Sequence, residues 1–167
     1  MKFRKKILEE QDHCYAVEVM EADGKPYVFF AAENRGGCFA WDCETLTERK
    51  QVWTEPGGTM SIVAIPNRPG EFLAVQKFFR LYDWEEACLV WVKPAAEGGY
   101  QVKELFTLPY LHRFDLLQRD GRIWLIACTL AAHKQTREDW SCAGSVYAAE
   151  LPSDWDGTFA LRELRGD

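Results

Sequence analysis

The tetrapeptides Ala22-Asp23-Gly24-Lys25, Arg68-Pro69-Gly70-Glu71 and Arg119-Asp120-Gly121-Arg122 divide the 167-residue chain at nearly equal intervals. Their glycines recur with a period of about 50 residues, which is within the range of propeller blades. Each tetrapeptide joins two runs rich in β-branched and aromatic residues, a pattern typical of a β-hairpin. The sequence therefore predicts three copies of one β-unit.

Each copy contains four predicted strands. The second strand of each copy is almost continuously apolar, as expected of a strand that is covered on both faces. First strands are expected at 15–20, 61–65 and 113–117, second strands at 27–32, 72–75 and 124–128, third strands at 37–41, 87–92 and 144–149, and fourth strands at 49–53, 101–106 and 159–164.

The repeat predicts an all-β fold, a partial β-propeller of four-stranded antiparallel blades in a single domain spanning 1–167. Blade one is expected at 14–56, blade two at 60–108 and blade three at 112–165. A β-sandwich is the alternative, because it also has many short strands at regular spacing. Sandwiches do not usually repeat a four-stranded unit along the sequence, and the propeller is therefore favoured.

Residues 3–10 match residues 48–55 in their basic start, apolar pair and acidic end, which predicts an orphan fourth strand before blade one. Three blades fall short of the roughly four to eight that close a ring. We therefore expect an open ring, completed by further chain or by another copy, with self-association through the bare end blades. Four apolar side chains are expected in the core between blades, Phe29, Trp41, Trp91 and Ile126.

The end of the third strand of blade one, Trp41-Asp42 followed by Glu44-Thr45-Leu46, resembles the WD-repeat propellers. The blades also resemble FG-GAP-type bacterial propellers. Both resemblances imply a propeller fold. Blades two and three depart from the WD-repeat pattern, because they have Trp91-Val92 and Ala148-Ala149 at the corresponding positions. The alternating aspartates of the FG-GAP calcium loop are missing, so no calcium site is carried over from that family.

Composition narrows the class of function. The net charge of −6, the pI near 5.2 and the scattered basic residues argue against a nucleic-acid partner. No apolar stretch reaches membrane-spanning length, so no membrane partner is expected. The basic start is followed by acidic residues at 9, 10 and 12 instead of an apolar segment, which favours a cytoplasmic protein. The six cysteines show no Cys-x-x-Cys pair, and reduced thiols are expected.

Blade topology sorts the loops into two faces. Because the strands of a blade alternate in direction, the start of the first strand and the loop between the second and third strands share a face. His112 and Arg113 fall at such a start, and His133 falls in such a loop. The other candidate ligand-binding residues expected on this face are Glu33, Arg35, Lys77, Asp139 and Trp140.

Asp-Trp pairs precede the third strands of blades two and three, at Asp83-Trp84 and Asp139-Trp140. One reading has the tryptophans cover loop ends or gaps between blades. The other has them as stacking platforms for a sugar, with acidic and arginine side chains bonding its hydroxyls. His112 and Arg113 are expected at the centre of such a site, and removing the Arg113 side chain is expected to weaken binding with little change in stability.

Three functions stay open at this point. The first is a propeller that binds a small polar ligand, with carbohydrate as the named class. The second is a metal-dependent carbohydrate-active enzyme of lyase or isomerase type, in which His112 and His133 bind a divalent metal together with a ligand from missing blades. The third is a structural interaction scaffold. No linear catalytic motif occurs in the sequence, so whether the protein is an enzyme stays open.

Overall fold

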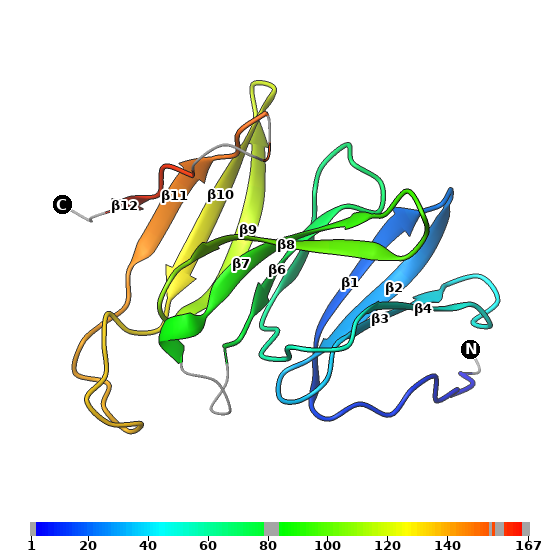
Figure 1. Cartoon of the computed structure of the whole chain (residues 1–167), viewed down its shortest axis with the longest axis horizontal. Helices are drawn as coiled ribbons and strands as arrows, with labels where there is room; N and C mark the ends of the chain where they lie inside the picture. Colours follow the sequence, from blue (N-terminus) through cyan, green and yellow to red (C-terminus); the bar gives the residue numbers. More distant parts are fainter. Residues whose placement is uncertain (1–2, 79–83, 154, 156–158, 165–167) are drawn as a thin grey trace.

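The computed structural model describes residues 3–78, 84–153, 155 and 159–164. Within these residues the strands form three separate antiparallel sheets of four strands each, which lie side by side in Figure 1. Each sheet contains four strands that follow one another along the chain. Blade one contains β1 (Cys14–Ala22), β2 (Lys25–Ala32), β3 (Cys38–Asp42) and β4 (Arg49–Trp53); blade two contains β5 (Ile62–Ala64), β6 (Phe72–Gln76), β7 (Cys88–Pro94) and β8 (Tyr100–Thr107); blade three contains β9 (Leu111–Arg119), β10 (Arg122–Thr129), β11 (Val146–Glu150) and β12 (Arg162–Leu164).

This architecture confirms the predicted all-β partial propeller. A sandwich would bring two sheets face to face with connections that cross between them, whereas here the order within every sheet is the order in sequence. A short 3-10 turn, η1 (Trp84–Glu86), precedes β7. In the described part of the chain, no helix is long and apolar enough to cross a membrane.

The core lies in two layers, one on each side of blade two. Phe29 of blade one packs against Phe72 of blade two with ring centroids 5.3 Å apart. On the other side, Trp91 of blade two stacks on Trp155 at 4.9 Å. Every residue of β6 is buried, because blade two has a neighbour on both faces. Phe29 and Trp91 are therefore core residues between blades, as predicted.

The first strands of the blades lie next to one another, β1 beside β5 and β5 beside β9. Arg113 of β9 joins all three. Its Nη1 donates to the carbonyl oxygen of Met60 at 2.5 Å, just before β5, and its Nη2 donates to the hydroxyl of Tyr15 in β1 at 2.8 Å. The three first strands thus converge on one line, as the inner strands of propeller blades do.

In the described part of the chain, the end blades each leave one face without a neighbouring blade. Val17 and Val19 of β1 are both 58% exposed, and Leu117 of β9 is 54% exposed. Trp41 pairs with Val28 in register, on the side of blade one that faces away from blade two. Ile126 pairs with Asp115 on the corresponding outer face of blade three. Within the described chain, the expectation that Trp41 and Ile126 lie in a core between blades is therefore wrong, because each side chain is half-buried on a face that no other described blade of the same chain covers.

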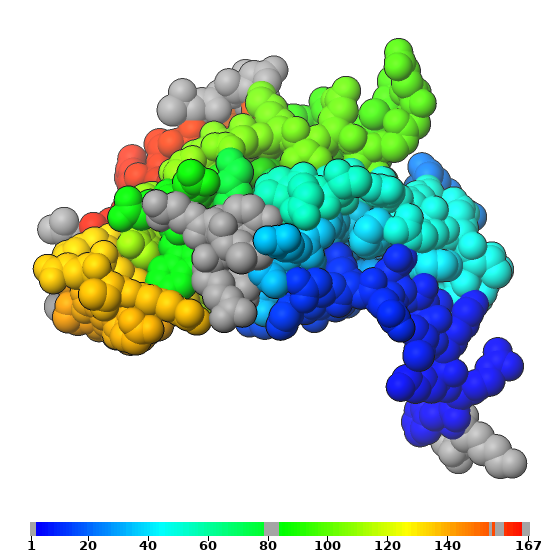
Figure 2. All heavy atoms as spheres, turned by 60° about the horizontal axis from the view of Figure 1, so that its bottom comes forward, coloured from blue at the N-terminus to red at the C-terminus, as the bar shows by residue number. Residues whose placement is uncertain are grey.

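The amino-terminal segment differs from its prediction. Residues 3–11 are described but lie outside the strands, and no sheet edge among the described residues pairs with them. Side chains hold the segment near blade one: Lys6 donates to the carbonyl oxygen of Leu46 at 2.7 Å, and Arg49 pairs with Glu9 at 2.6 Å. Figure 2 shows the segment in dark blue, projecting from the body of the molecule.

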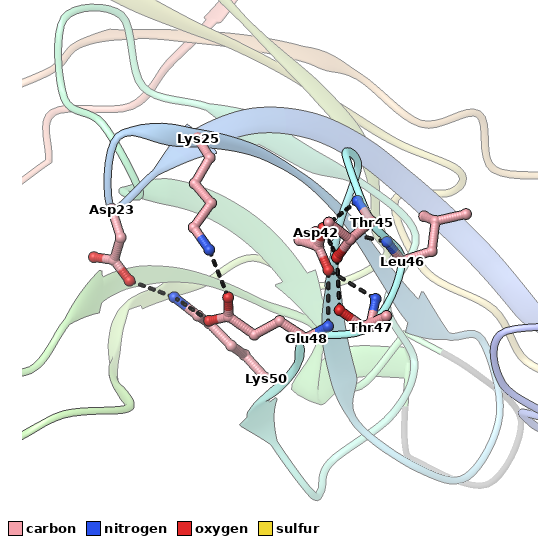
Figure 3. Close-up of polar contacts among 8 residues, drawn as sticks. All are labelled: Asp23, Lys25, Asp42, Thr45, Leu46, Thr47, Glu48 and Lys50. Carbon is pink, nitrogen blue, oxygen red and sulfur yellow. Dashed lines mark hydrogen bonds and ion pairs between the residues drawn. The ribbon is translucent and has the colours of Figure 1, made fainter.

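Asp42, the acidic residue of the Trp-Asp pair, organises the turn between β3 and β4 (Figure 3). Its carboxylate is buried and accepts hydrogen bonds from the backbone amides of Thr45, Thr47 and Glu48 at 2.6, 2.9 and 2.7 Å. These bonds, led by the one from Glu48, hold the pKa of Asp42 well below its usual range. The residue is therefore a fixed anion that sets the turn.

Candidate functional site

A pocket of about 370 Å³ opens between blades two and three, at the end where their first strands begin. Two connections between second and third strands contribute most of it: the described residues of the β6–β7 connection, which include Phe78 and η1, and residues 130–145 between β10 and β11, at the lower left of Figure 1. Both lie on the side that the strand alternation predicts. The pocket is lined by Glu33, Met60, Phe78, Trp84, Tyr110, His112, Leu130, Lys134, Arg137, Glu138 and Trp140.

Aromatic rings form the walls. Phe78 stacks on Trp84 with centroids 6.3 Å apart and planes 13° from parallel. Trp84 meets Tyr110 edge to face at 6.4 Å, and Phe78 meets the His112 ring in the same way at 5.0 Å. The rings hold one another in fixed orientations, so the walls exist before any ligand arrives.

Gly58 allows the floor of the pocket to form. Its φ is +71°, and a Cβ at this position would lie 2.5 Å from the backbone nitrogen of Phe78. The same nitrogen donates to the carbonyl oxygen of Gly58 at 3.1 Å. Any larger residue would therefore push apart the two backbone segments that carry Met60 and Phe78 into the pocket.

Lys134 occupies the space between the two pocket tryptophans. Its ammonium lies 3.2 Å from the ring centroid of Trp140 and 4.8 Å from that of Trp84, and it donates to the carbonyl oxygen of Arg137 at 2.8 Å. Phe78 covers one face of the Trp84 ring and Lys134 approaches it as well, so Trp84 serves packing. Trp140 is 61% exposed and keeps accessible surface for a ligand.

The Asp139 side chain does not line the pocket but bonds to other residues of the β10–β11 connection. One carboxylate oxygen accepts bonds from the Ser141 amide and hydroxyl at 2.9 and 2.7 Å, and the other accepts the Gln135 amide at 3.0 Å. The Gln135 bond, followed by those from Ser141, lowers the pKa of Asp139 to about 2. The aspartate is therefore an anion whose acceptor sites are already used within its own loop, and it positions Trp140 next to it.

His112 enters the pocket as a half-buried ring. Burial lowers the pKa of His112, and the neighbouring positive charge of Arg113 lowers it further. The His112 imidazole is therefore neutral at neutral pH. Among the described residues of the lining, the charged side chains are two carboxylates, Glu33 and Glu138, and two cations, Lys134 and Arg137, so their charges balance.

Several other candidates lie outside the pocket lining. Arg113 bridges the first strands, and Lys77 pairs with Glu104 at 3.2 Å. Arg35 is exposed, and His133 contacts the Cys142 sulfur at 3.2 Å. Of the predicted ligand-binding residues, the pocket brings together Glu33, His112 and Trp140.

Six further lining residues were not predicted from the sequence: Met60, Phe78, Tyr110, Leu130, Arg137 and Glu138. Aromatic residues at the ends of the apolar runs could have indicated some of these positions, because loops beside the start of a first strand lie at the same end of the blade as the pocket. Asp83 of the first Asp-Trp pair lies outside the described residues.

The two histidines offered as metal ligands have different surroundings. His112 packs against Phe78, whereas His133 faces Cys142 and does not line the pocket. Among the residues that the structure describes, no group of three or more histidine, cysteine or acidic side chains could hold a metal ion. A metal at this site stays a prediction that depends on ligands from elsewhere.

Two solved structures share this fold. No protein-family model and no curated protein sequence matches the chain. A glycoside hydrolase family 43 arabinoxylan arabinofuranohydrolase from Bacillus subtilis, solved in complex with cellotetraose, matches 89% of the chain with a TM-score of 0.50 and 14% identity. The hydrazine synthase of Kuenenia stuttgartiensis matches 87% with a TM-score of 0.53 and 12% identity.

Both of these proteins contain a β-propeller. The chain covers 35% of the length of the first and 40% of the second. The fold and the comparisons together define the class as propeller-like, and the described residues of this chain form three consecutive four-stranded blades.

Proposed function

We propose that this chain is a ligand-binding propeller unit whose pocket between blades two and three takes a small neutral polar molecule, with carbohydrate as the class. The observation that carries the proposal is the pocket itself, whose preformed aromatic walls are joined by a few polar groups. Concave, largely apolar pockets with few polar groups are the usual form of small-molecule sites. Trp140 offers an apolar ring face, and Glu33 and Glu138 offer acceptors for hydroxyl groups.

The charge balance of the lining supports a neutral ligand. An anion would meet Glu33 and Glu138, and a second cation would compete with the Lys134 ammonium already held between the tryptophans. A sugar carries hydroxyls that donate and accept hydrogen bonds and apolar C–H faces that pack on aromatic rings. The Bacillus subtilis structure holds cellotetraose, so gluco-oligosaccharides are a sensible first probe for this chain.

Calorimetric titration with cellotetraose and with arabinoxylan oligosaccharides tests the proposal, with W140A and V102A as paired variants. Val102 is exposed on β8 of the middle blade and does not line the pocket. We expect saturable binding that W140A weakens about fivefold, because an aromatic contact is worth about 1 kcal/mol, and that V102A leaves unchanged. Absence of binding to every neutral saccharide, or equal weakening by both variants, would contradict the proposal.

A second role is assembly through the outer faces of the end blades. Within the chain, apolar faces of neighbouring blades pack together to form both core layers. The face bearing Val17 and Val19 and the face bearing Leu117 and Trp124 are of the same kind, and no described blade of the chain packs against them. We propose that a second copy of this chain covers them head to tail, since two copies of three blades give six, a number that closes a propeller ring.

A further inference from the structure

A thiol and an imidazole face each other in the connection between β10 and β11. The sulfur of Cys142 lies 3.2 Å from Nε2 of His133. Cys142 is half-buried and His133 is exposed, and neither residue lines the pocket. The pair is therefore accessible from solvent and separate from the proposed ligand site.

The backbone fixes this pair. Ala131 and Ala143 form an antiparallel bridge, and the Ala132 amide donates to the carbonyl oxygen of Cys142 at 3.3 Å. The two arms of the loop are thus held opposite each other, which brings together side chains nine residues apart in sequence. The hydrogen bonds of Asp139 brace the turn of the same loop.

The geometry of the pair is that of a base beside a nucleophile. An imidazole within hydrogen-bond distance accepts the proton of a thiol and gives the thiolate, the nucleophilic form. The Ser141 hydroxyl lies 3.7 Å from the Cys142 sulfur and bonds to Asp139 at 2.7 Å, so the loop holds polar side chains around the thiol.

The other cysteines provide a contrast within the same molecule. Cys38 and Cys88 are buried, and burial raises the pKa of Cys38 well above its usual range and that of Cys88 to about 12. Cys14 is exposed, but partial burial of its thiol also raises its pKa. Cys43 is exposed and provides the reference for an accessible thiol.

We propose that Cys142, with His133 as its base, is a site of mixed-disulfide formation with small-molecule disulfides. His133 takes the thiol proton, and the Cys142 thiolate attacks one sulfur of the disulfide. A new S–S bond to Cys142 forms while the S–S bond of the reagent breaks. The departing thiolate takes the proton from His133 and leaves as a thiol, so Cys142 is oxidised and half of the reagent is reduced.

The test measures the rate at which each cysteine reacts, by peptide-resolved mass spectrometry of the native full chain. Two uncharged probes are used, iodoacetamide and bis(2-hydroxyethyl) disulfide. Although Cys142 is less exposed than Cys43, we expect it to react about tenfold faster with both probes. In H133N the Cys142 rate should fall to that of Cys43, whereas H13N, at an exposed histidine beside β1, should leave it unchanged.

The buried Cys38 and Cys88 report on folding in every variant, because they become labelled if the chain opens. H133Q provides a second substitution if H133N exposes them. Cys142 rates no greater than those of Cys43 in the wild-type chain would overturn the proposal. So would a fast Cys142 that keeps its rate in both His133 variants while the buried cysteines stay protected.

Discussion

At the residue scale, the role predicted for Arg113 from the sequence differs from the contacts that this side chain makes in the structure. The sequence places this arginine at the start of an inner strand, where it was expected to bind ligand and to contribute little to stability. In the structure its guanidinium bonds to Met60 and Tyr15 and lies 5.0 Å from the centroid of the Tyr15 ring. No linear pattern could have found these partners, because they come from two other blades.

We predict that Arg113→Ala lowers the free energy of unfolding by about 1–2 kcal/mol, since hydrogen bonds that involve a charged group are lost between blades. Denaturant unfolding followed by tryptophan fluorescence measures the change. Arg119→Ala is the matched control, because Arg119 is 78% exposed at the outer hairpin, and its effect should stay within about 0.5 kcal/mol. Equal stability of R113A and wild type would remove Arg113 from this structural role.

We predict that the Asp42 carboxylate makes a contribution to the stability of the fold that is lost in acid solution. Its folded pKa lies well below the ordinary value of 3.8, so the carboxylate stabilises the fold fully at pH values above the ordinary pKa. That contribution is lost as the pH falls below about 4 toward the folded pKa. The difference in thermal midpoint between wild type and D42N should therefore be constant from about pH 7 to 5 and shrink in more acid solution.

Thermal unfolding of both proteins across this pH range provides the measurement. The subtraction isolates Asp42 from other carboxylates with lowered pKa values, such as Asp139 and Glu104. A difference that stays constant down to the acid limit would show that the charge of Asp42 does not support the turn. The Trp41-Asp42 pair marked this position in the sequence. The burial of the carboxylate and its backbone amide partners could be seen only in the structure.

At the element scale, strand positions were largely predictable from the sequence. Each hairpin combines a glycine turn with apolar runs, and a period of two residues sets which side chains share a face. The two-residue period along a strand does not show which face of the sheet packs against another blade. Trp41 and Trp91 occupy equivalent third strands, yet Trp91 is 8% exposed between blades two and three while Trp41 lies on an outer face.

We therefore predict unequal costs for the same substitution. Trp91→Ala should lower the free energy of unfolding by about 3–5 kcal/mol, because it leaves a cavity beside Trp155 and removes the bond from Trp91 Nε1 to Glu71. At protein concentrations low enough to keep the chain monomeric, Trp41→Ala should cost only about 1–2 kcal/mol, since less surface is removed from water at a half-buried position. Denaturant midpoints of the monomer measure both variants, and equal costs there would mean that another part of the same chain covers the outer face of blade one.

The candidate site was predictable only in part, for a reason that also belongs to this scale. Strand alternation correctly indicated which loops share a face, and Glu33, His112 and Trp140 do meet at one pocket. Which side chains turn inward depends on loop conformation. The bonds of Asp139 to its own loop and the position of Lys134 between two rings arise from local geometry that spacing in the sequence does not encode.

At the scale of the whole molecule, the three blades form an open arc, and we propose that a second copy covers its two outer faces. Val17 lies on the outer face of blade one, 58% exposed, and Val102 lies on β8 of the middle blade, 40% exposed. A glutamate at either position is tolerable in an exposed strand. Only at Val17 would it place a charge in the proposed interface, where an unpaired buried charge is strongly unfavourable.

Sedimentation velocity over a range of protein concentrations tests this claim most directly. We predict that wild type and V102E associate to the same compact dimer, whereas V17E sediments as a monomer at every concentration. A wild-type chain that stays monomeric throughout the range, or a V102E variant that dissociates as V17E does, would contradict the account.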